Sequence, residues 1–451
     1  MKAVNPATGA EVAEYPDHTP ADATRAAELS HAAYEDWRQT SFSHRAASMQ
    51  RAASILRAQK LEHARLMAVE MGKPVAQGEA EVEKCAWVCE YYAEHAERFL
   101  RDEPIPTDAT RSFVAYQPLG VVLAVMPWNF PFWQVFRFAA PALMAGNTGL
   151  LKHSSIVPGC ALAIERVFRE AGFPSRVFQS LLIPAAAVPA LIEHPRIVAV
   201  TLTGSTPAGQ SVASTAGQVV KKVVLELGGS DPYVILKDAD VQKAARLCAT
   251  SRLINNGQSC IAAKRFIVVE SRLAEFEEHF VTAMGEAKLG DPLAPETTLG
   301  PQATVALRDE LHQQVQRSLA AGAHLLLGGE PGRHAFYPAT VLTRVRKGMP
   351  AFDEELFGPV AAVVSARDEA EAIALANDSS FGLGAAVFTN DVARGEEIAA
   401  RRIQAGCCFV NDFVRSDPRL PFGGIKASGF GRELSSFGIR EFVNIKTVYV
   451  K

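Results

Sequence analysis

One cysteine in a polar, glycine-containing turn is the first feature of this sequence that suggests chemistry. Cys260 follows Gly257, Gln258 and Ser259 and lies between two apolar runs. Most cysteines behave as small hydrophobic residues inside cores. This turn instead leaves the thiol accessible and offers backbone amides to a reacting atom. Taken alone, the pattern fits both a nucleophile and a structural turn.

A carboxylate at the end of a strand-like run is the second such feature. Glu226 lies near the end of the strand-like segment 219–229, which finishes with Gly228-Gly229. Flanking leucines should partly desolvate the carboxyl group and raise its pKa toward the range of a general base. The alternative is an edge-strand glutamate that faces water. A thiol together with such a carboxylate suggests thioester formation followed by hydrolysis.

Four further segments carry a family resemblance. They are Pro127-Trp128-Asn129-Phe130-Pro131, Gly204-Ser205-Thr206-Pro207-Ala208-Gly209, Glu355-Leu356-Phe357-Gly358-Pro359 and Pro421-Phe422-Gly423-Gly424-Ile425-Lys426. With the cysteine turn, they resemble the aldehyde dehydrogenase superfamily in unbroken order, from about residue 3 to the last residue. The run from Gly257 to Phe266 is similar to the short succinate-semialdehyde dehydrogenases. The resemblance implies oxidation of an aldehyde, with succinate semialdehyde as the expected substrate.

The resemblance also implies the catalytic residues. Cys260 is the expected nucleophile, and Glu226 is the expected base that activates water against the thioester. The side-chain amide of Asn129 and the main-chain N–H of Cys260 are the expected oxyanion donors, a contribution typically worth about 2.7–4 kcal/mol per donor. By itself, Asn129 would be interpreted as a turn residue before Phe130-Pro131.

A nicotinamide cofactor is implied in the same way. Gly204 and Ser205 open a helix after a strand, where main-chain amides can hold phosphate, although an ordinary helix cap is the alternative for this segment. Lys152 would contact the adenosine ribose, or else be a solvated charge at a strand end. The full set of expected cofactor residues is Trp128, Lys152, Ser155, Gly204, Ser205, Glu355 and Phe357.

The position of Ser155 bears on the choice between NAD and NADP. Many NAD-preferring relatives carry a glutamate three residues after the lysine, where this chain reads Lys152-His153-Ser154-Ser155. Without that carboxylate nothing repels a 2′-phosphate, and a hydroxyl donor is gained. We expect NADP or NAD as the cofactor, with NADP favoured.

One arginine is placed to bind the far end of the substrate. Arg137 follows Asn129 by eight residues on a predicted helix, which is about two turns, so it can face the same tunnel and hold a terminal carboxylate. An ion pair with a carboxylate at a domain interface is the alternative. Ser259 and Ser416 are expected to add hydroxyl donors. Ile254 stands where animal relatives carry a second arginine.

From residue 112 onward, short apolar runs alternate with helical stretches. Strands are predicted at 121–126, 148–152, 177–182, 198–203 and 219–226, and helices at 131–144, 158–171, 186–194 and 206–217. This alternation predicts α/β architecture with a parallel, doubly wound sheet. Ligands bind such sheets beyond the carboxyl ends of the strands, where the segments above are found.

The predicted organisation has three parts. Residues 1–108 and 127–228 form a Rossmann-like NAD(P)-binding domain, and residues 229–420 form an α/β catalytic domain. Residues 109–126 and 421–451 form a small β extension that bridges and oligomerises. The resemblance implies that a hairpin near 112–125 pairs with the last strand, giving a homodimer or homotetramer.

Composition excludes several classes of function. A net charge of −3 over 451 residues gives no basic surface for nucleic acid or an anionic membrane. No run of 18 apolar residues and no signal-peptide core occur, so we expect a cytoplasmic protein. Seven scattered cysteines indicate reduced thiols rather than disulfides. Cys85 and Cys89 are interpreted as core residues and not as metal ligands, and Cys407-Cys408 as part of a buried strand.

Three alternative functions remain at this stage. A CoA-acylating relative would release the acyl group to CoA, but such enzymes generally lack the deacylating glutamate. An aldehyde dehydrogenase of other or broad substrate range would share the same catalytic residues. A catalytically silent structural relative would not need to keep Cys260, Glu226, Asn129 and Lys152 together.

Overall fold

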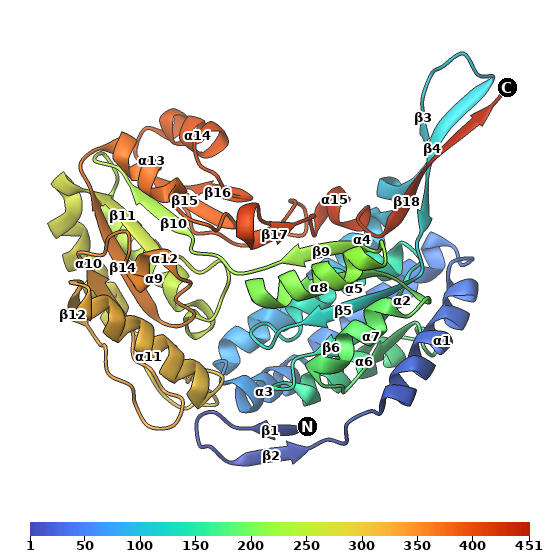
Figure 1. Cartoon of the computed structure of the whole chain (residues 1–451), viewed down its shortest axis with the longest axis horizontal. Coiled ribbons are helices and arrows are strands. Elements are labelled where there is room, and N and C mark those ends of the chain that lie inside the picture. Colours follow the sequence, from blue (N-terminus) through green and yellow to red (C-terminus); the bar gives the residue numbers. More distant parts are fainter.

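Three sheets of three or more strands organise the chain, and the computed structural model describes residues 1–451. Figure 1 shows a six-stranded sheet and a seven-stranded sheet side by side, each with its own helices, and a three-stranded sheet that projects from the body. A short hairpin of β1 (Lys2–Val4) and β2 (Glu11–Glu14) lies at the N-terminus. The predicted α/β class is confirmed.

The six-stranded sheet has the order β17-β9-β8-β5-β6-β7. Its strands are β5 (Val121–Met126), β6 (Thr148–His153), β7 (Phe178–Ser180), β8 (Ile197–Thr203), β9 (Lys222–Glu226) and β17 (Gly429–Phe430). The five strands β5 to β9 are parallel, and only β17 is antiparallel to its neighbour. All five predicted strands are confirmed to within three residues at each end.

Helices cover both faces of this sheet. They are α1 (Pro20–Trp37), α2 (Phe42–Ala58), α3 (Lys60–Met71), α4 (Val75–Leu100), α5 (Trp133–Met144), α6 (Pro158–Glu170), α7 (Val188–Glu193) and α8 (Thr206–Gln218). Successive side chains of β5 point to opposite faces of the sheet. Val121 and Leu123 belong to the hydrophobic core shared with α1, α7 and α8. Val122 and Ala124 belong to the core shared with α2, α4, α5 and α6. Two covered faces explain why β5 is apolar at every position.

Local sequence signals mark the start of α1 and the end of α3. Thr19 and Asp22 form a reciprocal capping box at the start of α1. Gly72 ends α3 in the left-handed region, with φ 79°. Cys85 and Cys89 lie on α4 and are fully buried in the hydrophobic core, which agrees with their interpretation as core residues.

The seven-stranded sheet has the order β12-β13-β14-β11-β10-β15-β16 and is parallel except for β12. Its strands are β10 (Pro232–Ile235), β11 (Arg265–Val269), β12 (His324–Leu327), β13 (Thr340–Thr343), β14 (Val360–Ala366), β15 (Gly384–Phe388) and β16 (Cys407–Val410). Its helices are α9 (Val241–Leu253), α10 (Leu273–Gly285), α11 (Val305–Ala320), α12 (Pro350–Asp353), α13 (Glu369–Asn377) and α14 (Val392–Arg401). Cys407 and Cys408 lie in a strand, β16, as predicted, but that strand is half-buried rather than buried, and both thiols are free.

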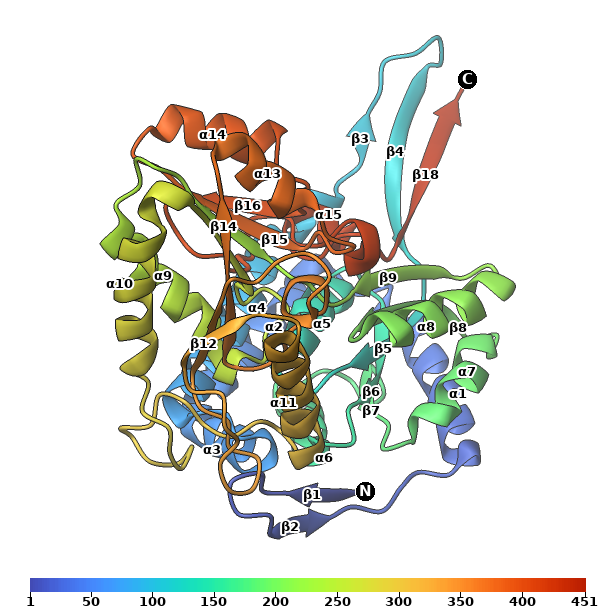
Figure 2. The ribbon, with the colours of Figure 1, turned by 60° about the vertical axis from the view of Figure 1, so that its left-hand side comes forward.

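The projecting sheet corrects one prediction. It consists of β3 (Glu103–Pro104), β4 (Arg111–Pro118) and β18 (Val443–Val450), and β4 and β18 pair antiparallel along their whole length. Figure 2 shows it standing clear of the body, with α15 (Ser435–Ile439) at its base. The expected hairpin at 112–125, and the assignment of all of 109–126 to this sheet, were wrong. β5 belongs to the six-stranded sheet because its entirely apolar sequence requires burial on both faces.

No helix combines the length and the apolarity that a membrane crossing requires.

Candidate active site

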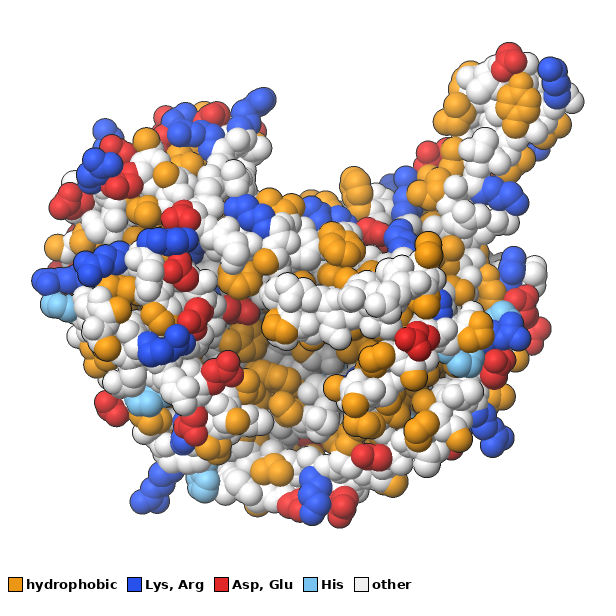
Figure 3. All heavy atoms as spheres, in the orientation of Figure 1, with side chains coloured by type: hydrophobic (Ala, Val, Ile, Leu, Met, Phe, Trp, Pro, Cys, Tyr) orange, Lys and Arg blue, Asp and Glu red, His pale blue; other side chains and the backbone are white.

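Two cavities meet at Cys260. One, of about 500 Å³, lies between α4, α5 and the cysteine turn, and is called the α4 cavity here. The other, of about 620 Å³, lies between the start of α8 and α11, and is called the α8 cavity. Figure 3 shows the surface hollowed between the two larger sheets, with hydrophobic side chains along the hollow. Only Cys260 and Gln134 line both cavities.

The turn that carries Cys260 is fixed by unusual backbone geometry. Asn255 and Asn256 both adopt positive φ, and Gly257 follows with φ 74°. A Cβ at Gly257 would lie 2.2 Å from the carbonyl of Gly358, so only glycine fits. Lys264 Nζ donates to the main-chain oxygens of Ser259 and Cys260, at 2.9 and 2.7 Å. These contacts hold the thiol between the two cavities.

The surroundings of Cys260 favour the protonated form of its thiol. Burial raises the pKa of Cys260 to about 12, although the positive charges of Arg137 and Lys264 act in the opposite direction. A thiol with this pKa is a weak nucleophile until a base removes its proton. Attack by the sulfur must therefore be preceded by loss of the thiol proton.

Asn129 is held by two hydrogen bonds at the wall between the cavities. Its Nδ2 donates to the main-chain oxygen of Gln258 at 2.9 Å, and its Oδ1 accepts from Gln134 Nε2 at 3.1 Å. The bond from Gln134 fixes which end of the amide is the donor. Sequence reasoning missed Gln134, although a buried glutamine in a mostly apolar helix five residues after Asn129 was a visible signal.

Glu226 lies behind the wall of the cavities rather than on it. Its carboxyl group is fully buried, and burial, followed by the charge of Glu433, raises its pKa well above the usual range. The predicted direction of this shift is confirmed. Neither oxygen has a hydrogen-bond partner. The side chain points at Gly423, where a Cβ would lie 2.7 Å from Oε1.

Arg137 lines the α4 cavity but is already paired. Its Nε forms an ion pair with Glu433 Oε2, its Nη2 donates to Thr203 Oγ1 at 3.3 Å, and its guanidinium lies over the ring of Phe422 at 4.8 Å. The alternative of an ion pair with a carboxylate is thus what the structure contains. Removing Arg137 would leave Glu433 buried without a cation next to Glu226, so the effect should extend to every substrate.

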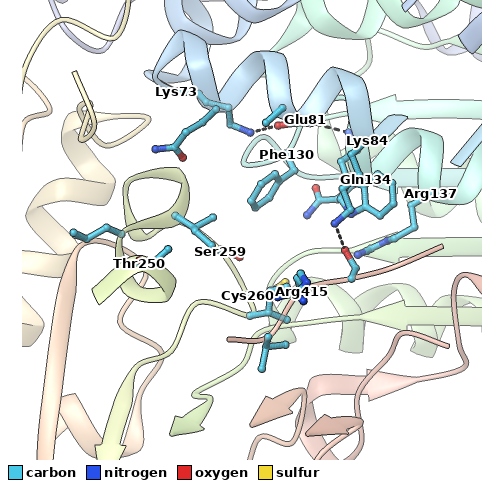
Figure 4. A pocket seen from close by; sticks show the side chains of 18 of the residues that line it. Lys73, Glu81, Lys84, Phe130, Gln134, Arg137, Thr250, Ser259, Cys260 and Arg415 are labelled. Atoms are coloured by element: carbon cyan, nitrogen blue, oxygen red, sulfur yellow. Dashed lines mark hydrogen bonds and ion pairs between the residues drawn. The ribbon is translucent and has the colours of Figure 1, made fainter. Parts of the chain in front are cut away.

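The other expected substrate residues line the same cavity. Ser259 and Ser416 both contribute to it, and so does Ile254. Ser416 Oγ accepts a hydrogen bond of 2.8 Å from Lys84 Nζ. Figure 4 shows Lys84, Gln134 and Arg137 on one side of the cavity and Ser259 with Cys260 on the other. Lys84 was not identified from the sequence, because nothing in α4 suggested chemistry.

Five of the seven expected cofactor residues line the α8 cavity. They are Trp128, Gly204, Ser205, Glu355 and Phe357. The rings of Trp128 and Phe357 meet edge to face at 5.7 Å. Ser205 is the N-cap of α8, but its side chain makes no capping hydrogen bond, so its hydroxyl is free for a ligand. Free amides at a helix start, next to a free hydroxyl, suit an anionic group.

The remaining two, Lys152 and Ser155, lie outside the lining of this cavity. Lys152 is mostly buried at the end of β6, and burial lowers its pKa. Its ammonium forms neither a hydrogen bond nor an ion pair, and Ser155 is exposed three residues later. A buried charge without a partner is costly. These groups therefore fit the hydroxyl and phosphate groups of a nucleotide.

Comparisons with known proteins agree with this geometry. A protein of Synechocystis named a probable succinate-semialdehyde dehydrogenase (NADP(+)) is 51% identical over 451 residues, which is 99% of each chain. Succinate semialdehyde dehydrogenase (NAD(P)+) Sad of Escherichia coli is 48% identical over 99% of this chain and 97% of its own. The crystal structure of succinic semialdehyde dehydrogenase from Streptococcus pyogenes with NADP+ superposes with a TM-score of 0.97 at 38% identity, over 100% of this chain and 99% of that one.

A family model matches nearly the whole length as well. It is described as the aldehyde dehydrogenase family and covers residues 1–448. With relatives at about half identity over almost the full length, the resemblance inferred from the motifs is confirmed. The chain belongs to the aldehyde dehydrogenase family.

Proposed function

We propose that this enzyme oxidises succinate semialdehyde to succinate with NADP+ as the preferred cofactor. The observation that carries the proposal is the position of Cys260, whose thiol lines a partly apolar cavity with cationic side chains and also a cavity with a free helix start. A single sulfur can then hold an aldehyde in the first cavity while a nicotinamide lies in the second. The names of the full-length relatives support this substrate and cofactor.

In the proposed reaction, the Cys260 thiol gives up its proton to water in the cavity, and the resulting thiolate attacks the aldehyde carbon. The side-chain amide of Asn129 and the main-chain N–H of Cys260 hold the resulting oxyanion. NADP+ supplies the acceptor for the hydride that leaves this carbon. Glu226 then activates a water molecule, which attacks the thioester and releases the acid. Because Glu226 lies behind the cavity wall, we propose that it acts through a change of side-chain rotamer or through one bridging water.

The proposed substrate shell is Arg137, Ser259 and Ser416. These three side chains line the α4 cavity together with the thiol. Trp128, Gly204, Ser205, Glu355 and Phe357 are proposed to hold the cofactor in the α8 cavity, and Lys152 and Ser155 beyond it. The six-stranded sheet, including β5, would form the cofactor domain, and residues 229–420 the catalytic domain.

The first test is substrate selection. We expect NADP-dependent turnover of succinate semialdehyde with kcat/KM at least tenfold above that for butanal, and no requirement for CoA. Formation of NADPH, followed by absorbance, measures both. Turnover that depends on CoA would indicate the acylating chemistry instead. Absence of turnover with every aldehyde would indicate a silent structural relative.

The second test concerns the cofactor. We expect kcat/KM with NADP to equal or exceed that with NAD, because Ser155 is an exposed hydroxyl where a carboxylate would repel the 2′-phosphate. Ser155→Glu should lower the efficiency with NADP by about tenfold or more, since like charges at close range cost several kcal/mol, while NAD is affected less. Preference of the unaltered enzyme for NAD above tenfold would contradict this assignment.

We further propose a cytoplasmic homo-oligomer built on the projecting sheet. All seven cysteines are free, as expected in a reducing compartment. The last strand, β18, carries exposed Ile445, Tyr449 and Val450, and an uncovered apolar edge favours pairing with a second copy. A monomeric mass in solution would contradict this part of the proposal.

A further inference from the structure

One cation in the α4 cavity has no carboxylate partner. Four other charged side chains line the cavity besides Lys84, and each of them is paired. Lys73 and Glu81 pair with each other, Arg137 pairs with Glu433, and Arg415 pairs with Asp412 at 2.8 Å. Lys84 forms no ion pair. The cavity therefore carries one uncompensated positive charge, and it shares this cavity with the nucleophile.

The surroundings of Lys84 leave its ammonium open to a ligand. Its Nζ lies 4.3 Å from the ring centre of Trp133 and donates to Ser416 Oγ at 2.8 Å. An ammonium has three protons to donate, so capacity remains after this one hydrogen bond. The hydroxyl of Ser416 can rotate and donate to the same acceptor. Apolar side chains, among them Phe130 and Leu253, line the rest of the cavity.

The shape of the site favours one class of ligand. Desolvating a cation without an anion is unfavourable, and an incoming carboxylate would remove that penalty while accepting two hydrogen bonds. The same molecule must place an aldehyde carbon at Cys260, across an apolar space. An aliphatic aldehyde with a carboxylate at its other end meets all three requirements.

We propose that Lys84, assisted by Ser416, binds the terminal carboxylate of the aldehyde and thereby selects carboxylate-bearing substrates. This inference rests on the proposed function, and it assigns the recognition of the anion to a residue on α4. Arg137, which lines the same cavity, then has a second task, which is to neutralise Glu433 beside Glu226. Arg415 contributes less, because its charge is already balanced by Asp412 at the exposed rim.

The charge of Lys84 should also make substrate selection depend on pH. Burial, and next the charge of Arg137 on α5, lower the pKa of Lys84 to about 8, whereas Cys85, Asp417 and Glu81 act to raise it. Asp417 is itself held by Arg419 at 2.6 Å. The ammonium that binds a carboxylate is present below this pKa and is lost above it. Preference for anionic aldehydes should therefore fall above about pH 8, by up to tenfold per pH unit.

The test compares matched aldehydes in matched variants. Malonate semialdehyde is compared with propanal, and succinate semialdehyde with butanal. The two aldehydes of each pair have equal length, and only the semialdehyde carries a carboxylate. Their kcat/KM ratio is measured for the unaltered enzyme, Lys84→Met, Lys84→Arg and Arg415→Met from pH 6.5 to 9.5. The ratio cancels the ionisation of Cys260, which both aldehydes require.

Lys84→Met should lower the ratio by about 30-fold or more, mainly through KM for the anionic aldehyde, since removing one partner of a desolvated charge pair has effects of this size. It should also abolish the fall of the ratio above pH 8. Lys84→Arg should recover a large part of the preference and move the fall to higher pH, because the pKa of arginine lies above 12. Arg415→Met, which removes a paired cation from the same cavity, should change the ratio by less than about threefold. Turnover of the uncharged aldehyde reports that each variant is folded.

The outcomes separate this inference from the proposed function. An unchanged ratio in Lys84→Met, with succinate semialdehyde still preferred by the unaltered enzyme, would overturn the role of Lys84 and leave the substrate intact. Preference for another carboxylate aldehyde that is lost in Lys84→Met would support Lys84 and overturn succinate semialdehyde. No preference for any carboxylate aldehyde in the unaltered enzyme would overturn both.

Discussion

Cys260→Ala is expected to abolish aldehyde oxidation, with neither steady turnover nor a first equivalent of reduced cofactor. Cys260 is one of two residues that line both cavities, and the other, Gln134, has no nucleophilic atom. Without the sulfur no covalent adduct forms, so an aldehyde in the α4 cavity has no route to transfer its hydride. Losses from removing a covalent nucleophile reach about 10⁶-fold in well-studied enzymes. The NADPH absorbance at enzyme concentrations comparable to substrate measures this directly.

Cys407→Ala provides the matched control. Cys407 lies in β16, it is a free thiol like Cys260, and burial raises its pKa as well. It lines neither cavity, so its removal should leave the first equivalent and the steady rate almost unchanged. A Cys260→Ala enzyme that still formed NADPH with an aldehyde, or loss of activity in Cys407→Ala alone, would show that the nucleophile had been assigned to the wrong thiol.

Local sequence predicted the parts of the site that depend on short segments. The cysteine turn needs Gly257 because the carbonyl of Gly358 approaches closely. Gly257 and Cys260 are only three positions apart, so a short segment of sequence is enough to predict this turn. The five parallel strands of the six-stranded sheet were predictable for a similar reason. Each is a short apolar run between helical segments, and burial on two faces imposes that pattern on every strand separately.

Features that depend on residues far apart in the chain could not be predicted. Lys84 meets Ser416 across 332 positions, and Arg137 meets Glu433 across almost as many. The spacing of apolar residues in α4 or α5 does not indicate which distant residue will contact Lys84 or Arg137. The boundary of the projecting sheet was wrong for a different reason. The family resemblance assigned β5 to this sheet together with β4, although the entirely apolar sequence of β5 already indicated burial on both faces.

Glu226→Gln is expected to keep the first half of the reaction and lose the second. Its amide cannot activate water, but it leaves Cys260 and Asn129 in place. Mixing the variant with NADP+ and succinate semialdehyde should therefore give about one equivalent of NADPH per active site, followed by a steady rate reduced by about 10²–10⁴-fold, the usual contribution of a general base. Stopped-flow absorbance and the mass of the trapped acyl-enzyme, increased by one succinyl group, measure both parts.

The stability of the Glu226→Gln variant separates loss of the base from loss of the fold. Burial and the neighbouring Glu433 raise the pKa of Glu226 in the folded protein, whereas the unfolded chain has a carboxyl pKa of about 4.3. Between these values the folded state binds more protons than the unfolded state, so the group lowers stability as pH rises through that window. A neutral amide has no such penalty. The variant should unfold at the same or a higher temperature than the unaltered protein at pH 7, with little difference below pH 4.

Glu433→Gln is the companion variant, because it removes the second carboxylate and leaves the proposed base. Glu433 raises the pKa of Glu226, so its neutralisation should make Glu226 easier to ionise and keep steady turnover measurable. Retention of steady turnover at the unaltered rate by Glu226→Gln, together with its loss in Glu433→Gln, would move the role of the base from Glu226 to Glu433. Turnover at the unaltered rate in both variants would mean that neither carboxylate alone is required for hydrolysis of the thioester.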